Sequence, residues 1–259
     1  MKNKHPAGQI GLLLLVIMGV VVALVMSVAS RSLSDTVLSR QERESSAAFS
    51  LAESGIEKAM NEIKSSGGQS LSGNLSGLAN FVSGEYNIEP SATFGLYVKE
   101  GETAHLDLTN YIPTITLAWT KKSDSIENVA TCTEGSQGAP AAVEIAAYVG
   151  SSVTRSYYNP FGCVPGPNGF ANSSDGGNEY LSSVMDYPIP VGTTMLRIKP
   201  IYAGATLSVS GTGLQNQLYL IQSQASGGDA KKEIEVKRGL DAPPSIFDFA
   251  VFTAGTIVK

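Results

Sequence analysis

The sequence predicts an α+β protein in which one long N-terminal helix packs against an antiparallel, β-rich head domain. Three observations predict this fold class. Residues 9–28 are uncharged and mostly apolar, apolar residues beyond Arg31 recur with a helical period, and short β-branched or aromatic runs separated by turn residues follow Gly68. The expected parts are a leader (1–8), a membrane-spanning helix (9–30), its amphipathic continuation (31–66), a linker (67–84) and an extracytoplasmic head (85–259).

The apolar N-terminal segment has the length needed to cross a bilayer. Residues 10–28 form a helix of about 28 Å, close to the thickness of the hydrocarbon layer. Lys2 and Lys4 precede it, whereas both signs of charge follow it. The positive-inside bias therefore keeps the leader cytoplasmic and predicts a single-pass protein of the cytoplasmic membrane with its C-terminal domain outside. The residues expected to face lipid or sister helices are Ile10, Leu13, Val16, Val20 and Leu24.

Three interpretations of this N-terminus compete. A secretory signal would be cut after Val28-Ala29-Ser30, but the apolar run here is longer than the apolar region of a typical signal peptide, which has about 7–15 residues. A plain uncleaved anchor needs hydrophobicity alone. A prepilin-type leader would be cut on the cytoplasmic side between Gly8 and Gln9, so that the apolar helix stays in the mature protein. A small residue at the cut, a short basic leader and a helix that continues past the membrane favour this third interpretation.

The helix is expected to continue from Gln9 to Lys64 as one rod of about 84 Å. The Gly67-Gly68 pair that follows favours its termination. A helix of this length must bury the apolar stripe of its far half against its own chain. The stripe recurs at steps of four and three residues and comprises Ser45, Phe49, Ala52, Ile56, Ala59 and Ile63. Of these, Phe49, Ala52, Ile56 and Ile63 are expected to form the face that docks on the head.

The run Ala48-Phe49-Ser50-Leu51-Ala52-Glu53-Ser54-Gly55-Ile56-Glu57 resembles a segment of many type IV pilin-like proteins, especially the PilX-type minor pilins. In that family a Gly-terminated leader, an apolar helix and such a run occur in this order. The resemblance covers residues 1–65. Segments 114–120, 141–148, 155–160 and 243–252 are similar, more weakly, to the head domains of pilin-like proteins.

The resemblance implies a minor pilin subunit of a type IV filament system, assembled into a pilus or at its tip. The implied partners are membrane lipid, other pilin subunits, the pilus assembly machinery and a prepilin peptidase. One position departs from the pattern: Leu13 is the fifth residue after the expected cut, where most pilins carry a Glu that neutralises a neighbour's amine. A carboxylate in hydrocarbon is kept only where it has a partner. Its absence suggests either a tip subunit or a leader class whose filaments never use the Glu.

Composition bears on the function of the head. The formal charge of −5 does not favour nucleic-acid binding, and 16% charged residues with 27 glycines are typical of extracellular β domains. No Gly-x-Ser-x-Gly elbow, Walker loop or dinucleotide fingerprint occurs, so neither an enzyme nor a cofactor is expected. The alternative to a pilin subunit is a membrane-anchored exported binding or adhesion module that does not polymerise.

Period-two patterns predict the strands of the head. One antiparallel sheet is expected beside the distal half of the helix, whereas 71–84 and 159–180 are expected to be a linker and a surface loop. The predicted strands are 85–89, 94–98, 105–108, 114–120, 141–148, 153–158, 194–202, 205–210, 217–222, 233–236 and 247–252.

A few residues of the head invite a chemical interpretation. Cys132 and Cys163 are expected to form a disulfide worth about 3–4 kcal/mol by chain entropy, with two free thiols as the alternative. His105 alternates in a strand and is expected on the sheet surface rather than as a base or ligand. The loop 175–179 carries oxygen ligands without the spacing of a calcium loop. No metal site is therefore predicted, and Trp119, Tyr157 and Tyr158 are expected in the core rather than on a contact surface.

Overall fold

The computed structural model describes residues 7–66, 68–76, 81–108, 110–132 and 138–241. The chain divides into two compact units. The first comprises α1 up to Lys58 together with Gly73–Tyr86 and Ser223–Ile234, and the second comprises Ala59–Ser72, Asn87–Gln222 and the residues from Glu235 onward. Among the described residues α1 is the one helix, so the rest of the fold is built from strands.

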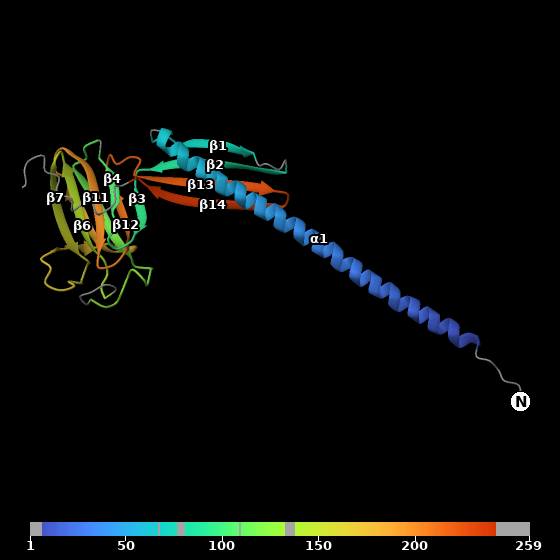
Figure 1. The fold of residues 1–259 in the computed structure, drawn as a ribbon. Helices are drawn as coiled ribbons and strands as arrows, with labels where there is room; N and C mark the ends of the chain where they lie inside the picture. The colour runs from blue at the N-terminus through green and yellow to red at the C-terminus, as the bar shows by residue number, and fades with distance from the viewer. Residues whose placement is uncertain (1–6, 67, 77–80, 109, 133–137, 242–259) are drawn as a thin grey trace, which may run out of the picture. The chain divides into compact units, whose positions relative to one another are not determined.

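Helix α1 (Ala7–Ser66) is continuous over 60 residues (Figure 1). Neither Pro nor a Gly pair interrupts the sequence between Gln9 and Ser66, so nothing in it breaks the hydrogen-bond ladder. The expected helix over residues 9–64 is confirmed. It ends just before Gly68, whose φ of +85° is the left-handed conformation that glycine adopts at helix ends.

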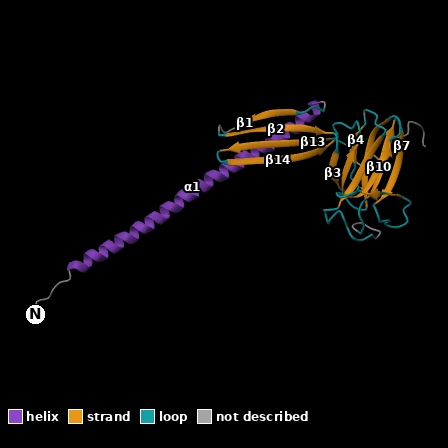
Figure 2. Ribbon diagram, turned by 180° about the vertical axis from the view of Figure 1, so that it is seen from behind, coloured by secondary structure: helices purple, strands orange, loops and turns teal. Residues whose placement is uncertain are grey.

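A four-stranded sheet has the order β1-β2-β13-β14. In the first unit, the far half of α1 lies along its strands in both ribbon views (Figures 1 and 2). The bounds are β1 (Leu71–Ser76), β2 (Val82–Ser91), β13 (Leu218–Gly227) and β14 (Ala230–Gly239). The α+β class expected from the sequence is therefore confirmed, because a long apolar N-terminal helix packs on a mostly antiparallel β domain.

The second unit contains two five-stranded sheets, β3-β12-β5-β10-β9 and β4-β11-β6-β7-β8. Apart from the parallel pair β7 and β8, the strand pairs with a defined register are antiparallel. The first sheet comprises β3 (Phe94–Val98), β12 (Ala205–Ser210), β5 (Thr114–Lys121), β10 (Tyr180–Pro188) and β9 (Ser174–Asp175). The second comprises β4 (Ala104–Asp107), β11 (Thr193–Ile201), β6 (Ala142–Val149), β7 (Ser152–Asn159) and β8 (Ala171–Asn172).

The two sheets enclose one apolar core and so form a β-sandwich. Leu117 and Trp119 of β5 pack in the same buried cluster as Ile145 of β6 and Leu196 of β11. Trp119 is fully buried, and its indole N–H donates to the carbonyl oxygen of Ala141 at 2.7 Å, so the one polar atom of its side chain is paired.

Four expectations about the strands need correction. The predicted linker contains β1, and the predicted surface loop 159–180 contains the short strands β8 and β9. The single expected sheet is replaced by a four-stranded sheet on the helix and a separate sandwich. Strand β10 was not predicted, because the β-bulge between Val184 and Tyr187 interrupts its alternation. The predicted strand 247–252 lies outside the described residues. The other predicted strands have counterparts.

Candidate functional site: the N-terminal helix and its docking face

The first half of α1 presents apolar side chains outward. Leu13, Val16, Val20 and Leu24 are each more than half exposed, as lipid-facing or helix-facing residues are expected to be. In the part of the chain that the structure describes, α1 is the one helix long and apolar enough to span a membrane. Gly8, Gln9 and Ile10 belong to the first turns of this helix, and their side chains lie outside the described residues.

Hydroxyl groups mark the end of the apolar segment. Ser30 Oγ donates to the carbonyl oxygen of Ser27 at 3.0 Å, and Ser34 Oγ donates to that of Ser30 at the same distance. Such back-bonding satisfies a hydroxyl within the helix itself, so these residues are tolerated beside lipid or a neighbouring helix. Leu33, Val37 and Leu38 follow and remain exposed.

The docking face of α1 begins at Glu44. Every residue from Leu13 to Arg43 is exposed, whereas a buried stripe runs from Glu44 through the next four turns. Its other members within the first unit are Ala48, Leu51, Ala52, Gly55 and Ile56. Of the residues predicted for this face, Ala52 and Ile56 are buried at 0% and 6% exposure. They lie on the face that was expected.

Phe49 was wrongly assigned to this face, because its side chain is 46% exposed. The stripe is rotated so that Ala48 and Gly55 take the central positions. Small side chains allow the helix backbone to approach the sheet, and a phenylalanine at the centre would hold the two apart. Ile63 is only partly buried and lines a cavity within the second unit.

Gly55 shows how close the approach is. A Cβ atom at Gly55 would lie 2.1 Å from Ser223 Oγ of β13 and 2.6 Å from Leu75 Cδ1 of β1. Real Cβ atoms do not show such distances, so a larger residue here would force the side chains of Ser223 and Leu75 to move away. The glycine of the pilin-like run therefore has a packing function in this chain.

The β13–β14 turn docks on the helix through Glu44, which is 6% exposed. The backbone N–H of Asp229 donates to Glu44 Oε2 at 3.5 Å, and Arg40 Nε donates to Oε1 at 2.6 Å. Gly228, with φ of +57°, leaves room for the carboxylate, since a Cβ there would lie 2.2 Å from Oε2. The hydrogen bond from Arg40 holds the pKa of Glu44 below its usual value, against the effect of desolvation. Sequence reasoning missed this residue, because a glutamate in a charged run gives no signal of burial.

Two cations lie over aromatic rings, one of them in β2 and the other just before it. The guanidinium carbon of Arg43 is 5.9 Å from the ring centroid of Phe81, and Lys58 Nζ is 5.2 Å from that of Tyr86. Each contact is worth about 0.5–1 kcal/mol at exposed sites. Together with Glu44, they fix the register of the helix on the sheet with charged groups as well as with apolar packing.

In the head, the structure joins Cys132 and Cys163 in a disulfide that connects two long loops of the sandwich. Glu127, 2% exposed, also fixes the first of these loops. Its carboxylate accepts hydrogen bonds from the backbone N–H groups of Lys121 and Thr206, at 2.9 and 2.8 Å, and from the Thr206 hydroxyl.

The loop with oxygen ligands is cross-linked by a lysine. Lys122 Nζ donates to Asp175 Oδ1 at 2.9 Å and to the carbonyl oxygen of Gly177 at 2.5 Å. The ammonium group thus binds Asp175, one of the oxygen ligands that the sequence offered for a cation, and a carbonyl oxygen of the same loop. No group of three or more His, Cys, Asp or Glu is placed to hold a metal ion among the described residues. Trp119 is a core residue, whereas Tyr157 and Tyr158 are half-buried.

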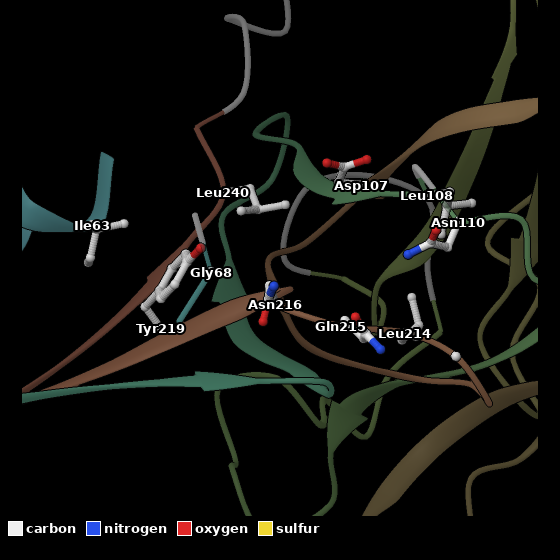
Figure 3. A pocket seen from close by; sticks show the side chains of 11 residues that line it. Ile63, Gly68, Asp107, Leu108, Asn110, Leu214, Gln215, Asn216, Tyr219 and Leu240 are labelled. Carbon is white, nitrogen blue, oxygen red and sulfur yellow. The ribbon is translucent and has the colours of Figure 1, made fainter. Parts of the chain in front are cut away.

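A cavity of about 350 Å³ lies within the second unit (Figure 3). Asp107, Asn110, Gln215 and Asn216 give it a polar side, and Leu214, Tyr219 and Leu240 an apolar one. Gln217 fixes this region, because its amide nitrogen donates to the Asp107 carbonyl at 2.8 Å and its amide oxygen accepts the Asp107 N–H at 3.0 Å. The polar groups in Figure 3 form no arrangement of a nucleophile and a base.

Comparison with known proteins gives no match to a family model, to a curated protein or to a solved structure.

Proposed function

We propose that this chain is a minor pilin-like subunit of a type IV filament system, anchored in the cytoplasmic membrane by α1 and assembled into or at the tip of a pilus. The proposal rests on the difference between the two halves of one unbroken helix. Its first half is apolar and exposed, and its second half, from Glu44, is docked on the chain's own sheet. A cleavable secretory signal has no need for such a continuation.

The chemistry of the exposed half supports the same proposal. Between Lys4 and Arg31 the sequence carries no Asp, Glu, Lys or Arg. The helix can therefore move from lipid into an apolar bundle without leaving an unpaired charge in an apolar environment. Leu13 offers no carboxylate to a neighbour's amine. A low-copy position at a tip avoids that problem, because no subunit lies above it.

Quantitative mass spectrometry of sheared filaments tests this proposal. We expect the chain in the filament fraction at a small fraction of the principal pilin, and we expect its loss from that fraction when the assembly ATPase is deleted. If the protein stays in the membrane fraction of assembling cells, the function is that of an anchored binding or adhesion module. A ratio near one between this chain and the principal pilin would contradict its assignment as a minor subunit but not its assignment as a pilin-like subunit.

A further inference from the structure

The cavity of the second unit combines an apolar floor with a polar rim (Figure 3). Leu214 and Tyr219 form the floor, and they are buried at 4% and 7% exposure. The rim carries side-chain amides, of which those of Asn110 and Gln215 belong to exposed residues and that of Asn216 to a half-buried one. A ligand in this cavity therefore meets amide groups at its edge and an aromatic ring at its base.

A buried glutamine holds the two loops of the rim together. The amide nitrogen of Gln217, which is 1% exposed, donates to the carbonyl oxygens of Asp107 and Gln215 at 2.8 and 2.7 Å. Its amide oxygen accepts the Asp107 N–H at 3.0 Å. One side chain thus fixes the start of the loop that carries Asn110 relative to the loop that carries Gln215. The rim is built before any ligand arrives.

Asn216 has a backbone conformation that is uncommon outside glycine. Its φ is +54°, in the left-handed region. Its side chain is closely packed as well, because a Cβ atom at Gly68 would lie 2.1 Å from Asn216 Nδ2. Residues held in such conformations cluster at ligand sites, where the surrounding structure imposes them. The conformation and the packing together hold this amide in one position at the rim.

The charge of the cavity limits the class of ligand. Among the described residues that line it, Asp107 is acidic and none is Lys, Arg or His. An anion would find no cation there to offset the loss of its hydration. A cationic amine would use acceptors alone and leave the NH2 groups of the rim amides unmatched. A hydroxyl group both donates and accepts, as an amide does, so neutral ligands rich in hydroxyl groups match the rim.

We propose that this cavity binds a neutral saccharide. Its hydroxyl groups bond to the amides of Asn110, Gln215 and Asn216, and the apolar face of a sugar ring lies against Tyr219 and Leu214. The volume of about 350 Å³ is near the lower end of the range for ligand sites, about 300–1,000 Å³, so the ligand is a monosaccharide or a disaccharide. The inference concerns the head and does not depend on whether the chain joins a filament.

Saturation-transfer NMR on the detergent-solubilised full chain tests this binding. The probes are glucose, galactose, mannose, N-acetylglucosamine and N-acetylgalactosamine, with choline and inorganic phosphate as charged probes. At least one saccharide is expected to receive saturation from the protein, and its dissociation constant should be the same at low and at high salt, because no charge is paired. No transfer to any saccharide, or transfer to a charged probe alone, would overturn the proposal.

Rim variants place the binding in the cavity. Asn110→Ala and Gln215→Ala should each weaken saccharide affinity about fivefold or more, the effect of losing a hydrogen bond to the ligand. Asn172→Ala, at an exposed asparagine of β8 that does not line the cavity, is the matched control and should leave the affinity unchanged. All three should keep the wild-type melting temperature, because the changes are at the surface. Unchanged affinity when both rim residues are replaced, or an equal loss in the control, would overturn the site.

Discussion

Gly55 of α1 lies directly against Ser223 of β13, with no space for even a methyl group between them. The run Ala48–Glu57, which carries the resemblance, therefore has a glycine at the point where the helix packs closely on the sheet. We expect Gly55→Ala to destabilise the folded first unit by about 1–3 kcal/mol, although alanine is the better helix former. Thermal unfolding of the detergent-solubilised full chain measures the loss.

Gly19→Ala is the matched control for this prediction. It makes the same change in the same helix, but no atom lies within 4 Å of the new Cβ. Its melting temperature should equal or exceed that of wild type. Equal losses in both variants would mean that the docking contact at Gly55 is absent in solution.

Ile56 and Phe49 should differ although both belong to the apolar stripe of the sequence. Ile56 is 6% exposed, so truncation to alanine should cost about 2–4 kcal/mol. Phe49 is 46% exposed, and Phe49→Ala should cost less than about 1 kcal/mol. Chemical denaturation of both variants distinguishes this register from the one in which Phe49 faces the sheet, where Phe49→Ala would be the more damaging change.

Most strands of the sandwich were predictable, because in β5 and β12 buried and half-exposed residues alternate as the sequence pattern requires. Strand β1 was not, since Gly73 and Asn74 are poor strand formers and its pairing depends on β2. The docking face was predicted approximately. By hydrophobicity alone, Phe49 is a better candidate than Gly55 for the face that packs on the sheet. Close packing of helix and sheet instead favours the smaller residue.

His105 should make the stability of the head depend on pH. Burial lowers the pKa of its imidazole, Asp107 opposes this effect, and Arg197 lowers the pKa further. The folded state therefore favours the neutral ring, and the unfolded chain binds the proton more tightly. This contribution to stability is complete above the unfolded pKa of about 6.5 and is lost as the pH falls through the folded pKa.

Urea unfolding between about pH 4 and pH 8 measures this dependence. We expect the free energy of unfolding to decrease below about pH 6.5 in wild type and to change less in His105→Gln over the same range. An identical slope in both proteins would assign the acid sensitivity to other groups.

The disulfide should stabilise the sandwich and leave the stability of the first unit unchanged. Cys132→Ser should lower the free energy of unfolding by about 3–4 kcal/mol, because the bond restricts the unfolded chain. Cys163→Ser and the double variant should lose the same amount, and a reducing agent should bring wild type to their level. A larger loss in the double variant would mean that the thiols contribute by packing and not by their bond.

The most direct test of the central claim is the intact mass of the protein extracted from membranes of a host that carries a prepilin peptidase. The account predicts that wild type lacks residues 1–8 and retains the rest of α1, because cleavage occurs between Gly8 and Gln9, while Gly8→Leu keeps the leader. A mass that corresponds to cleavage after Ser30 would contradict the account, since it would remove the apolar half of the helix from the mature protein.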